Sequence, residues 1–359
     1  MLVDPGRGVP RSRGVPKADQ PHNSRGGIGK GCSTVRVVVT GASGFVGAHT
    51  VQALVAAGHE VVGSARSAER VKRALAPLDC AHVDVVEADI SDQRAVAAAL
   101  RGADAVVHAA AVYSHDVRER RQILATNPLG TQLVLGQAAG MGLDPIVHVS
   151  SYVALLPLRG TMVPDSPIGL PRTPYALSKA RSEVIARRLQ REGAPVAITY
   201  PGMVWGPHDP AFGESTRLAQ AVLAGEIRVG APGAVPLVDV RDVAALHAAL
   251  LCTGRGPRRF LAAAEVVRMK DILSIVATLA DRPAPVGTVP GPIMLGLARI
   301  TDLLQRFVQH RLVPDYQSVW TALNCPSIDT SATVEELGIT FTAVDTTIAD
   351  TIRWMHATD

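Results

Sequence analysis

The chain has 359 residues, of which 47% are apolar and 19% are charged, a composition typical of a globular protein with a large core. Aromatic residues make up only 4%, which argues against stacking surfaces for single-stranded nucleic acid. The formal net charge is +4, and residues 1–33 alone hold six basic and two acidic residues. The remaining chain is therefore neutral, and we expect no nucleic-acid partner.

Residues 1–33 are rich in Gly, Pro, Arg and Ser and show no apolar periodicity. They lack the apolar stretch of a secretory signal peptide, so we expect a disordered basic tail, with a misassigned start of the protein as the alternative. The four cysteines, Cys32, Cys80, Cys252 and Cys325, are far apart and form no CxxC pair. This spacing predicts reduced thiols in a cytoplasmic protein, without a metal site or a disulfide framework.

The sequence contains no uninterrupted run of 18 apolar residues, so it predicts no membrane-spanning helix. The segment Val286–Ile300 comes nearest, but Pro290, Pro292 and Arg299 interrupt it. We expect a helix there that is buried or covers the substrate. Peripheral contact of this segment with a membrane surface is the alternative.

Strands and helices alternate along residues 34–204. The first predicted strand, Val35–Thr40, is a continuous apolar run, as expected of a strand that is buried on both faces. A helix from Phe45 to Ala57 follows. Further strands are expected at 61–62, 83–88, 105–111, 146–150 and 196–200, the last of them completing the sheet, with helices between them, including one at 92–100 that is capped by Ser91. The alternation predicts an α/β fold with a Rossmann-type, doubly wound parallel sheet.

After the fifth strand the character of the sequence changes. A proline-rich loop from Pro157 to Pro174 leads to a helix that contains Tyr175, and from Trp205 onward short strands, helices and loops are mixed. We therefore expect a nucleotide-binding domain at 34–204. Residues 205–359 are expected to form mainly a smaller α+β lobe that binds the substrate, with some segments returning to the first domain.

The first predicted strand runs into Gly41, Gly44 and Gly47, a GxxGxxG pattern that also contains Ser43. Glycines let the backbone turn tightly and approach a pyrophosphate, and the helix that follows offers its free N–H groups to the phosphates. Three glycines alone are a weak signal, but a strand before them and a helix after them make it specific. The pattern predicts a dinucleotide-binding site.

The end of the second strand indicates which dinucleotide is bound. A 2′-hydroxyl is usually held by an acidic residue there, and a 2′-phosphate by an arginine. The sequence has Arg66 and no acidic residue at this tip, which favours NADP(H) over NAD(H). Asp89 could meet the adenine, and the small residues Ala109, Ala110 and Ala111 leave room for the adenosine and its ribose.

Tyr175 and Lys179 are four residues apart and therefore share one face of a helix. A free tyrosine has a pKa of about 10, and a nearby ammonium lowers that pKa, so the pair could transfer a proton near neutral pH. Ser151, just after the fifth strand, could donate a hydrogen bond to a carbonyl oxygen that gains charge. Asn127 could anchor a proton-relay water, or could be a turn or helix-start residue before Pro128.

The chain resembles an extended short-chain dehydrogenase/reductase, a group within the NAD-dependent epimerase/dehydratase superfamily. Within that group it is similar to the dihydroflavonol reductase and 3β-hydroxysteroid dehydrogenase-like branch. The resemblance runs from about Val35 to Met355 and is carried by VVVTGASGFVGAHTVQAL, GSARS, EADISD, VVHAAA, TNPLGT, HVSSYVAL, YALSK, YPGMVWGP, PLVDVRDVA and EELGI. It implies that Ser151, Tyr175 and Lys179 are catalytic. It also implies that a set of residues surrounds the cofactor: Gly41, Gly44, Phe45, Val46, Gly47, Arg66, Asp89, Ile90, Pro201 and Val204.

Together these features point to an NADP(H)-dependent oxidoreductase that interconverts a carbonyl and an alcohol on a small to medium apolar substrate. Nucleotide-sugar epimerases and dehydratases of the same superfamily are the alternative. Dehydratases typically carry an acidic pair after the serine, where this chain has Tyr152, Val153 and Ala154, and epimerases typically carry an acidic residue where Arg66 stands. A non-catalytic NAD(P)-sensing protein would usually lack the Tyr or the Lys. A homodimer is expected by analogy alone.

Overall fold

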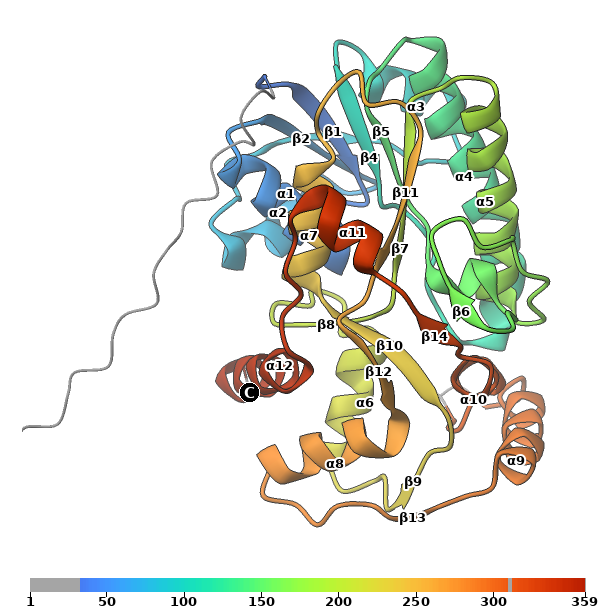
Figure 1. Cartoon of the computed structure of the whole chain (residues 1–359). Helices are drawn as coiled ribbons and strands as arrows, with labels where there is room; N and C mark the ends of the chain where they lie inside the picture. Colours follow the sequence, from blue (N-terminus) through green and yellow to red (C-terminus); the bar gives the residue numbers. More distant parts are fainter. Residues whose placement is uncertain (1–32, 309–311, 359) are drawn as a thin grey trace, which may run out of the picture.

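The computed structural model describes residues 33–308 and 312–358, and its centre is a seven-stranded parallel sheet (Figure 1). The strand order is β11–β7–β5–β4–β1–β2–β3, so the chain builds outward from β1 in both directions. The predicted Rossmann-type fold is confirmed. The strands are β1 (Arg36–Thr40), β2 (Glu60–Ala65), β3 (Asp84–Glu87), β4 (Ala105–His108), β5 (Ile146–Val149), β7 (Val196–Pro201) and β11 (Arg258–Ala262).

Successive side chains of β1 enter different layers of the core. Val37 and Val39 lie in an apolar cluster on one face of the sheet, and Val38 lies in a second cluster on the other face. Because both faces are covered by helices, the strand is a continuous apolar run and not an alternating one. The first face carries α1 (Phe45–Ala56), α2 (Ala68–Leu75) and α7 (Val240–Ala249), and the second carries α3 (Gln93–Leu100), α4 (Arg120–Gly140) and α5 (Pro174–Arg191).

The edge of the large sheet differs from the prediction. The sequence predicts that the strand at 196–200 completes the sheet, and this is wrong, because β11 pairs in parallel with β7 and forms the edge. Strand β11 comes from the C-terminal part of the chain, as does α7, which packs against α1. Both elements therefore return to the part of the molecule that holds the large sheet (Figure 1).

A smaller lobe lies at the carboxyl ends of the strands of the large sheet, below them in Figure 1. Its three-stranded sheet has the order β12–β10–β8. The sheet and the helices of this lobe form a separate apolar cluster, which includes Trp205, Leu237, Ile272 and Ile348. The strands are β8 (Met203–Trp205), β10 (Ala234–Asp239) and β12 (Glu265–Arg268), and the helices are α6 (Glu214–Leu223), α8 (Met269–Leu279), α9 (Gly291–Leu304), α10 (Tyr316–Leu323) and α12 (Val344–Thr358). Helix α11 (Ser331–Leu337) and two short parallel pairs, β6 (Thr161–Met162) with β14 (Ser327–Ile328) and β9 (Val229–Gly230) with β13 (Val286–Thr288), complete the described elements.

The start of α3 corrects a local prediction. Asp92, and not Ser91, is its N-cap residue, and the carboxylate of Asp92 accepts hydrogen bonds from the backbone N–H groups of Arg94 and Ala95. Ser91 instead donates its hydroxyl to the carboxylate of Asp89, over 2.6 Å. Both residue types are good caps, and the carboxylate has the stronger charge interaction with the helix N-terminus.

The cysteines are not all reduced. Cys252 is disulfide-bonded, so the expectation of free thiols is wrong there, whereas Cys80 and Cys325 are free. The expected tail at 1–33 and Cys32 lie outside the described residues, apart from Ser33. Within the described ranges, no helix is both long and apolar enough to cross a bilayer, and no group of His, Cys, Asp and Glu side chains could hold a metal ion.

A buried carboxylate joins α5 to the large sheet. Glu183, which is fully buried, accepts hydrogen bonds from the hydroxyls of Ser150 over 2.8 Å and Tyr200 over 2.6 Å. The Nε of Arg187 donates to the same carboxylate over 2.6 Å. Charge neutralisation and three donors together compensate for the loss of water around this carboxylate.

We predict that Arg187→Met lowers the free energy of unfolding by about 3–5 kcal/mol, because it leaves the carboxylate of Glu183 buried without its counter-charge. Urea unfolding followed by circular dichroism measures this difference. Arg188→Met on the exposed side of the same helix, where the pair with Glu192 spans 3.6 Å, is the matched control and should cost less than about 1 kcal/mol. Equal losses in the two variants would contradict the prediction.

Candidate active site

The glycine loop joins β1 to α1 and leaves room only for glycine at two positions. Gly41 has φ +74°, and a Cβ there would lie 2.7 Å from the Cα of Ala110. A Cβ on Gly47 would lie 2.1 Å from the carbonyl oxygen of Gly41. Helix α1 starts at Phe45, after Gly44, with no side-chain cap and no acidic residue in its first turn. Its first N–H groups and positive dipole end are therefore available to a phosphate, so the loop fits a dinucleotide.

For other residues expected around the cofactor the structure gives packing or exposure. Val46, Ala109 and Val204 are partly buried and pack against the apolar cluster on the α1 side of the large sheet. The backbone N–H of Ala110 donates to the hydroxyl of Thr40, over 3.3 Å. Other expected neighbours differ in exposure: Ser43 is partly buried, Ala111 is exposed, and Pro201 is buried at the end of β7.

At the ends of β2 and β3, Arg66 and Asp89 lie near each other. Arg66 is exposed, and its charge contributes to lowering the pKa of Asp89, although the larger cause is the pair of hydrogen bonds from Ser91. Ile90 packs against α4 so closely that a Cβ on Gly130 would lie 2.4 Å from its Cδ1. The structure thus brings together the three residues that the sequence predicts at the adenosine end.

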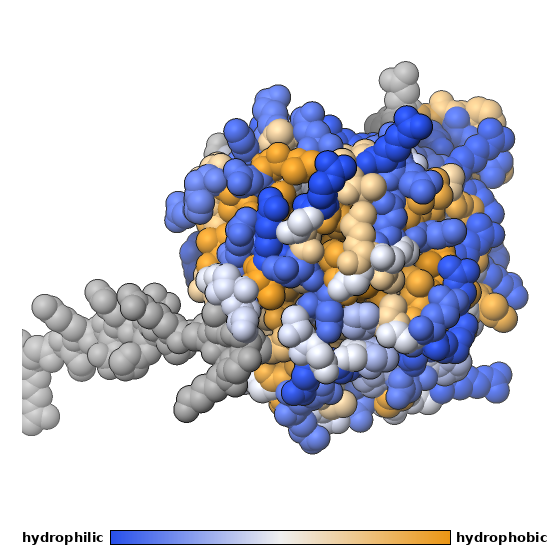
Figure 2. All heavy atoms as spheres, turned by 90° about the horizontal axis from the view of Figure 1, so that it is seen from above, coloured by the Kyte–Doolittle hydropathy of each residue, from blue (hydrophilic) through white to orange (hydrophobic). Residues whose placement is uncertain are grey.

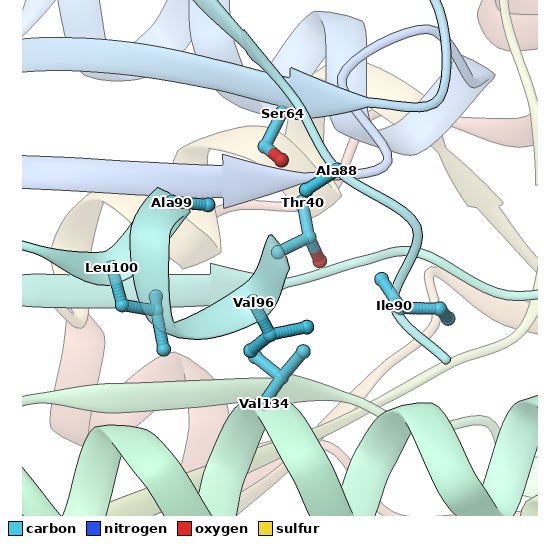
Figure 3. A pocket seen from close by; sticks show the side chains of 8 residues that line it. All are labelled: Thr40, Ser64, Ala88, Ile90, Val96, Ala99, Leu100 and Val134. Atoms are coloured by element: carbon cyan, nitrogen blue, oxygen red, sulfur yellow. The ribbon is translucent and has the colours of Figure 1, made fainter. Parts of the chain in front are cut away.

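A small internal cavity lies behind this end of the site (Figure 3). Its volume of about 10 Å³ is enough for roughly one water molecule and far too small for an adenine ring. The cavity is therefore a void between the sheet and the helices α3 and α4, and not the cofactor site. The residues around it are Thr40, Ser64, Ala88, Ile90, Val96, Ala99, Leu100 and Val134.

Tyr175 and Lys179 occupy consecutive turns at the start of α5. The Nζ of Lys179 lies 6.0 Å from the centre of the Tyr175 ring and donates to the carbonyl oxygen of Val149, over 2.8 Å. Burial lowers the pKa of Lys179 to about 8, although the carboxylate of Glu183 acts in the opposite direction. Burial also raises the pKa of the Tyr175 phenol above its ordinary value, so the phenol is protonated at neutral pH.

The two serines after β5 have different partners. The hydroxyl of Ser150 is bound to Glu183. Among the residues that the structure describes, the hydroxyl of Ser151 accepts only a long hydrogen bond of 3.5 Å from the N–H of Val153. Ser151 is therefore the serine whose hydroxyl is more easily turned to another partner. Tyr152, which follows Ser151, is buried and begins a short 3-10 helix.

Asn127 lies inside α4, so the alternative of a turn or helix-start residue is wrong. Its side-chain oxygen accepts from the N–H of Val112 over 2.7 Å, and its nitrogen donates to the carbonyl oxygen of Val112 and to Ser178 Oγ, each over 3.0 Å. These bonds fix the loop after β4 against α5. The relay-water role expected from the sequence stays a prediction.

Helix α10 contributes residues that the sequence analysis missed. The N-cap residue of α5, Thr173, makes no side-chain capping bond, and the N–H of Tyr175 donates instead to the side-chain oxygen of Gln317, over 3.1 Å. Among the described residues, the Nε2 of Gln317 has no hydrogen-bond partner, although the side chain is buried. No motif marks this residue, which is 142 positions away from Tyr175 in the sequence.

The loop after β4 supplies an aromatic wall. The ring of Tyr113, which is 50% exposed, packs edge-on against the ring of Tyr175 with 4.7 Å between their centres. The ring of His115 packs against Tyr113, and its Nδ1 lies 2.8 Å from Ser318 Oγ on α10. In the sequence, the position of Tyr113 and His115 just after the VVHAAA segment is the feature that could have pointed to this wall.

Comparison with known proteins agrees with this geometry. The family model described as "NAD dependent epimerase/dehydratase family" matches residues 37–263. Sterol demethylase protein B of Methylococcus capsulatus is 31% identical over 332 residues, which cover 89% of this chain and 98% of that protein. A protein provisionally named dihydroflavonol 4-reductase, from Synechocystis sp., is 28% identical over 330 residues, with coverage of 89% and 94%.

Among solved structures, a dTDP-glucose 4,6-dehydratase of Streptomyces venezuelae with NAD bound matches with a TM-score of 0.71 and 25% identity. The match covers 90% of this chain and 97% of that one. The family match extends from the glycine loop through the end of the large sheet. The chain belongs to the NAD-dependent epimerase/dehydratase family, a group of extended short-chain dehydrogenases/reductases that bind NAD(P).

Proposed function

We propose that the protein is an NADP(H)-dependent oxidoreductase that interconverts a ketone or aldehyde and an alcohol on a small to medium apolar substrate. One observation carries the proposal. The start of α5 presents Tyr175 and Lys179 beside the end of β5, where Ser151 follows. The glycine loop, which leads into an uncapped helix, follows β1 at the same edge of the parallel sheet, two strands away.

The proton states of this group favour reduction of a carbonyl. The protonated phenol of Tyr175 can donate its proton to the carbonyl oxygen, while Ser151 donates a hydrogen bond to the same oxygen. Lys179 is an ammonium below pH 8, and its charge stabilises the phenolate that is left behind. A bound nicotinamide cofactor would supply the hydride for the carbonyl carbon.

We assign the preference for NADP(H) to Arg66. Its guanidinium is exposed at the end of β2, where it could bind a 2′-phosphate in a bidentate manner. Asp89 makes hydrogen bonds with Ser91, so its carboxylate is already engaged. The NAD found in the solved dehydratase belongs to that enzyme, and the choice of cofactor here is tested below.

An apolar substrate is favoured by the surroundings of Tyr175. The exposed ring of Tyr113 offers a carbon-rich surface next to the Tyr175 ring. The names of the two relatives refer to a sterol and to a dihydroflavonol, which are both larger ring compounds. A nucleotide sugar would need free basic residues for its diphosphate. Arg241, however, is paired with Asp239 over 2.6 Å and with Asp350 over 2.8 Å.

Other activities are less well supported. In dehydratases an acidic pair follows the serine, whereas Tyr152, Val153 and Ala154 are all buried and carry no carboxylate. A non-catalytic NAD(P)-sensing protein would have no need for the tyrosine and lysine that lie side by side here. We propose for Asn127 a positioning role, because its bonds fix the loop that carries Tyr113.

We predict that Tyr175→Phe lowers the rate of NADPH-dependent carbonyl reduction by about 10²–10⁴-fold, because the proton donor is lost. A panel of ketones and aldehydes followed by NADPH absorbance measures the rate. Binding of NADPH, followed by fluorescence, should change little. Tyr316→Phe on α10 removes the same hydroxyl from a ring that lies under Arg299, and serves as the control. Undiminished reduction by Tyr175→Phe would overturn the proposed function, and turnover of nucleotide sugars only would favour the alternative.

The pKa of Lys179 predicts the alkaline limb of the activity. Because the ammonium form is the active one, kcat/KM for reduction should be constant below pH 8 and fall up to tenfold per pH unit above it. A profile of kcat/KM between pH 6 and 10 measures the limb. Lys179→Arg keeps its charge throughout this range, so its profile should lack the limb even if its maximum is lower. An identical limb in both proteins would exclude Lys179 as its source.

The cofactor preference has its own test. Arg66→Ala should weaken NADPH binding by about 10–100-fold, the effect of removing a charge-assisted hydrogen bond, and leave NADH binding nearly unchanged. Dissociation constants for both nucleotides give the ratio. Arg73→Ala near the end of α2, where the arginine pairs with Glu69, is the control. Equal losses for NADPH and NADH would remove Arg66 from 2′-phosphate recognition.

A further inference from the structure

Large apolar side chains that are exposed follow one another along α9 and the residues just after it. On the face seen in Figure 2, by contrast, hydrophilic residues interrupt the apolar ones throughout. An apolar surface of this kind on a folded protein usually marks an interaction site. The exposed side chains are Ile293, Leu297, Ile300, Leu303, Leu304 and Phe307, and we call them the α9 surface.

Helix α9 is apolar on the side that faces away from the protein. Ile293, Leu297, Ile300 and Leu304 follow the spacing of a single helix face, and each is about half exposed. The opposite face carries the fully buried Ala298 and packs on α10. A helix on a water-exposed surface normally shows the reverse pattern. The predicted helix forms, but only one of its faces is buried. That it covers the substrate stays a prediction, as does its contact with a membrane surface.

The polar groups of α9 complete the pattern. Asp302 lies on the inner side, where its carboxylate accepts from the N–H of Tyr316 over 3.3 Å. Arg299 packs over the Tyr316 ring with 5.1 Å between guanidinium carbon and ring centre, and it remains exposed. Arg306, just after the helix, is also exposed. Within the described residues 291–308 the helix therefore carries two exposed arginines, while the carboxylate of Asp302 lies on its inner side.

We propose that the α9 surface docks the protein onto an anionic lipid bilayer, with α9 lying in the plane of the membrane. Aliphatic side chains with arginines at the rim are typical of interfacial helices, because the arginines reach lipid phosphates while the aliphatic groups enter the acyl region. Protein interfaces are enriched in Tyr, Trp, Phe, Met and Arg, and of these aromatic types the surface holds only Phe307. With 14 residues α9 is about 21 Å long, too short to cross the bilayer.

The position of α9 relates membrane docking to the candidate active site. Helix α10 lies between α9 and the candidate active site and contributes Gln317, which binds the backbone of Tyr175. An enzyme docked by α9 would hold the site close to apolar molecules dissolved in the membrane. This link to a membrane-borne substrate rests on the proposed function. The helix face and its arginines do not depend on it.

Vesicle co-sedimentation of the full chain tests the docking without any substrate. We expect binding to phosphatidylcholine vesicles that contain 30% phosphatidylglycerol, weaker binding to phosphatidylcholine alone, and a loss on adding salt. The double variant Ile300→Glu/Phe307→Glu should bind at least about tenfold more weakly. Leu170→Glu, at a side chain that is 87% exposed elsewhere, is the control and should bind as the unmodified protein does.

The basic residues 1–33 are present in all of these proteins, so a difference between them cannot come from that segment. Thermal unfolding and nucleotide binding confirm that each variant is folded and keeps its nucleotide site. Docking is overturned if the unmodified protein ignores anionic vesicles or if the double variant binds them equally well. It is also overturned if the unmodified protein is a dimer in sedimentation equilibrium and does not bind lipid, and if the double variant alone is a monomer. The α9 surface would then be a dimer interface. A catalytically inactive protein that still binds vesicles would contradict the proposed function alone.

Discussion

The buried carboxylate of Glu183 is the interaction on which the geometry of the candidate site depends. An unpaired carboxylate inside a protein costs several kcal/mol, so α5 is held where Ser150 on the sheet side and Arg187 on the helix side can reach it. This requirement fixes the height of α5 against β5. Lys179, one turn before Glu183, then reaches the carbonyl oxygen of Val149. Since Ser150 is committed to the carboxylate, Ser151 is the serine with a hydroxyl to offer.

The elements that could be predicted from the sequence are those whose signal is local. The glycine loop is legible because Gly41 and Gly47 are constrained by contacts within one βα unit and the neighbouring β4. The strand β1 is legible because both of its faces are covered, which leaves a run of valines. The strand β11 begins with two arginines and has only a short apolar stretch, and five helices and strands separate it from β7 in the sequence. Nothing in Arg258–Ala262 itself states which sheet edge it joins, and so the last strand of the large sheet could not be predicted.

The parts of the site that could not be predicted come from long-range contacts. Tyr175 and Lys179 carry a recognisable spacing because helix geometry alone places them on one face. Tyr113 meets Tyr175 only because Asn127 holds the loop after β4 against α5. The exposed face of α9 could not be predicted for a related reason. An apolar sequence does not show which face of a helix packs against the rest of the protein. Local motifs therefore predict the residues that carry the chemistry, but they do not predict the long-range contacts that shape the substrate pocket.

Helix α10 links the C-terminal lobe to the helix that carries Tyr175. The first turn of any helix leaves backbone N–H groups without partners inside the helix. In α5, Pro174 has no N–H, and the side chain of Thr173 makes no cap, so the N–H of Tyr175 depends on Gln317 from the C-terminal lobe. The lobe that is expected to select the substrate thus also completes the helix that carries the tyrosine.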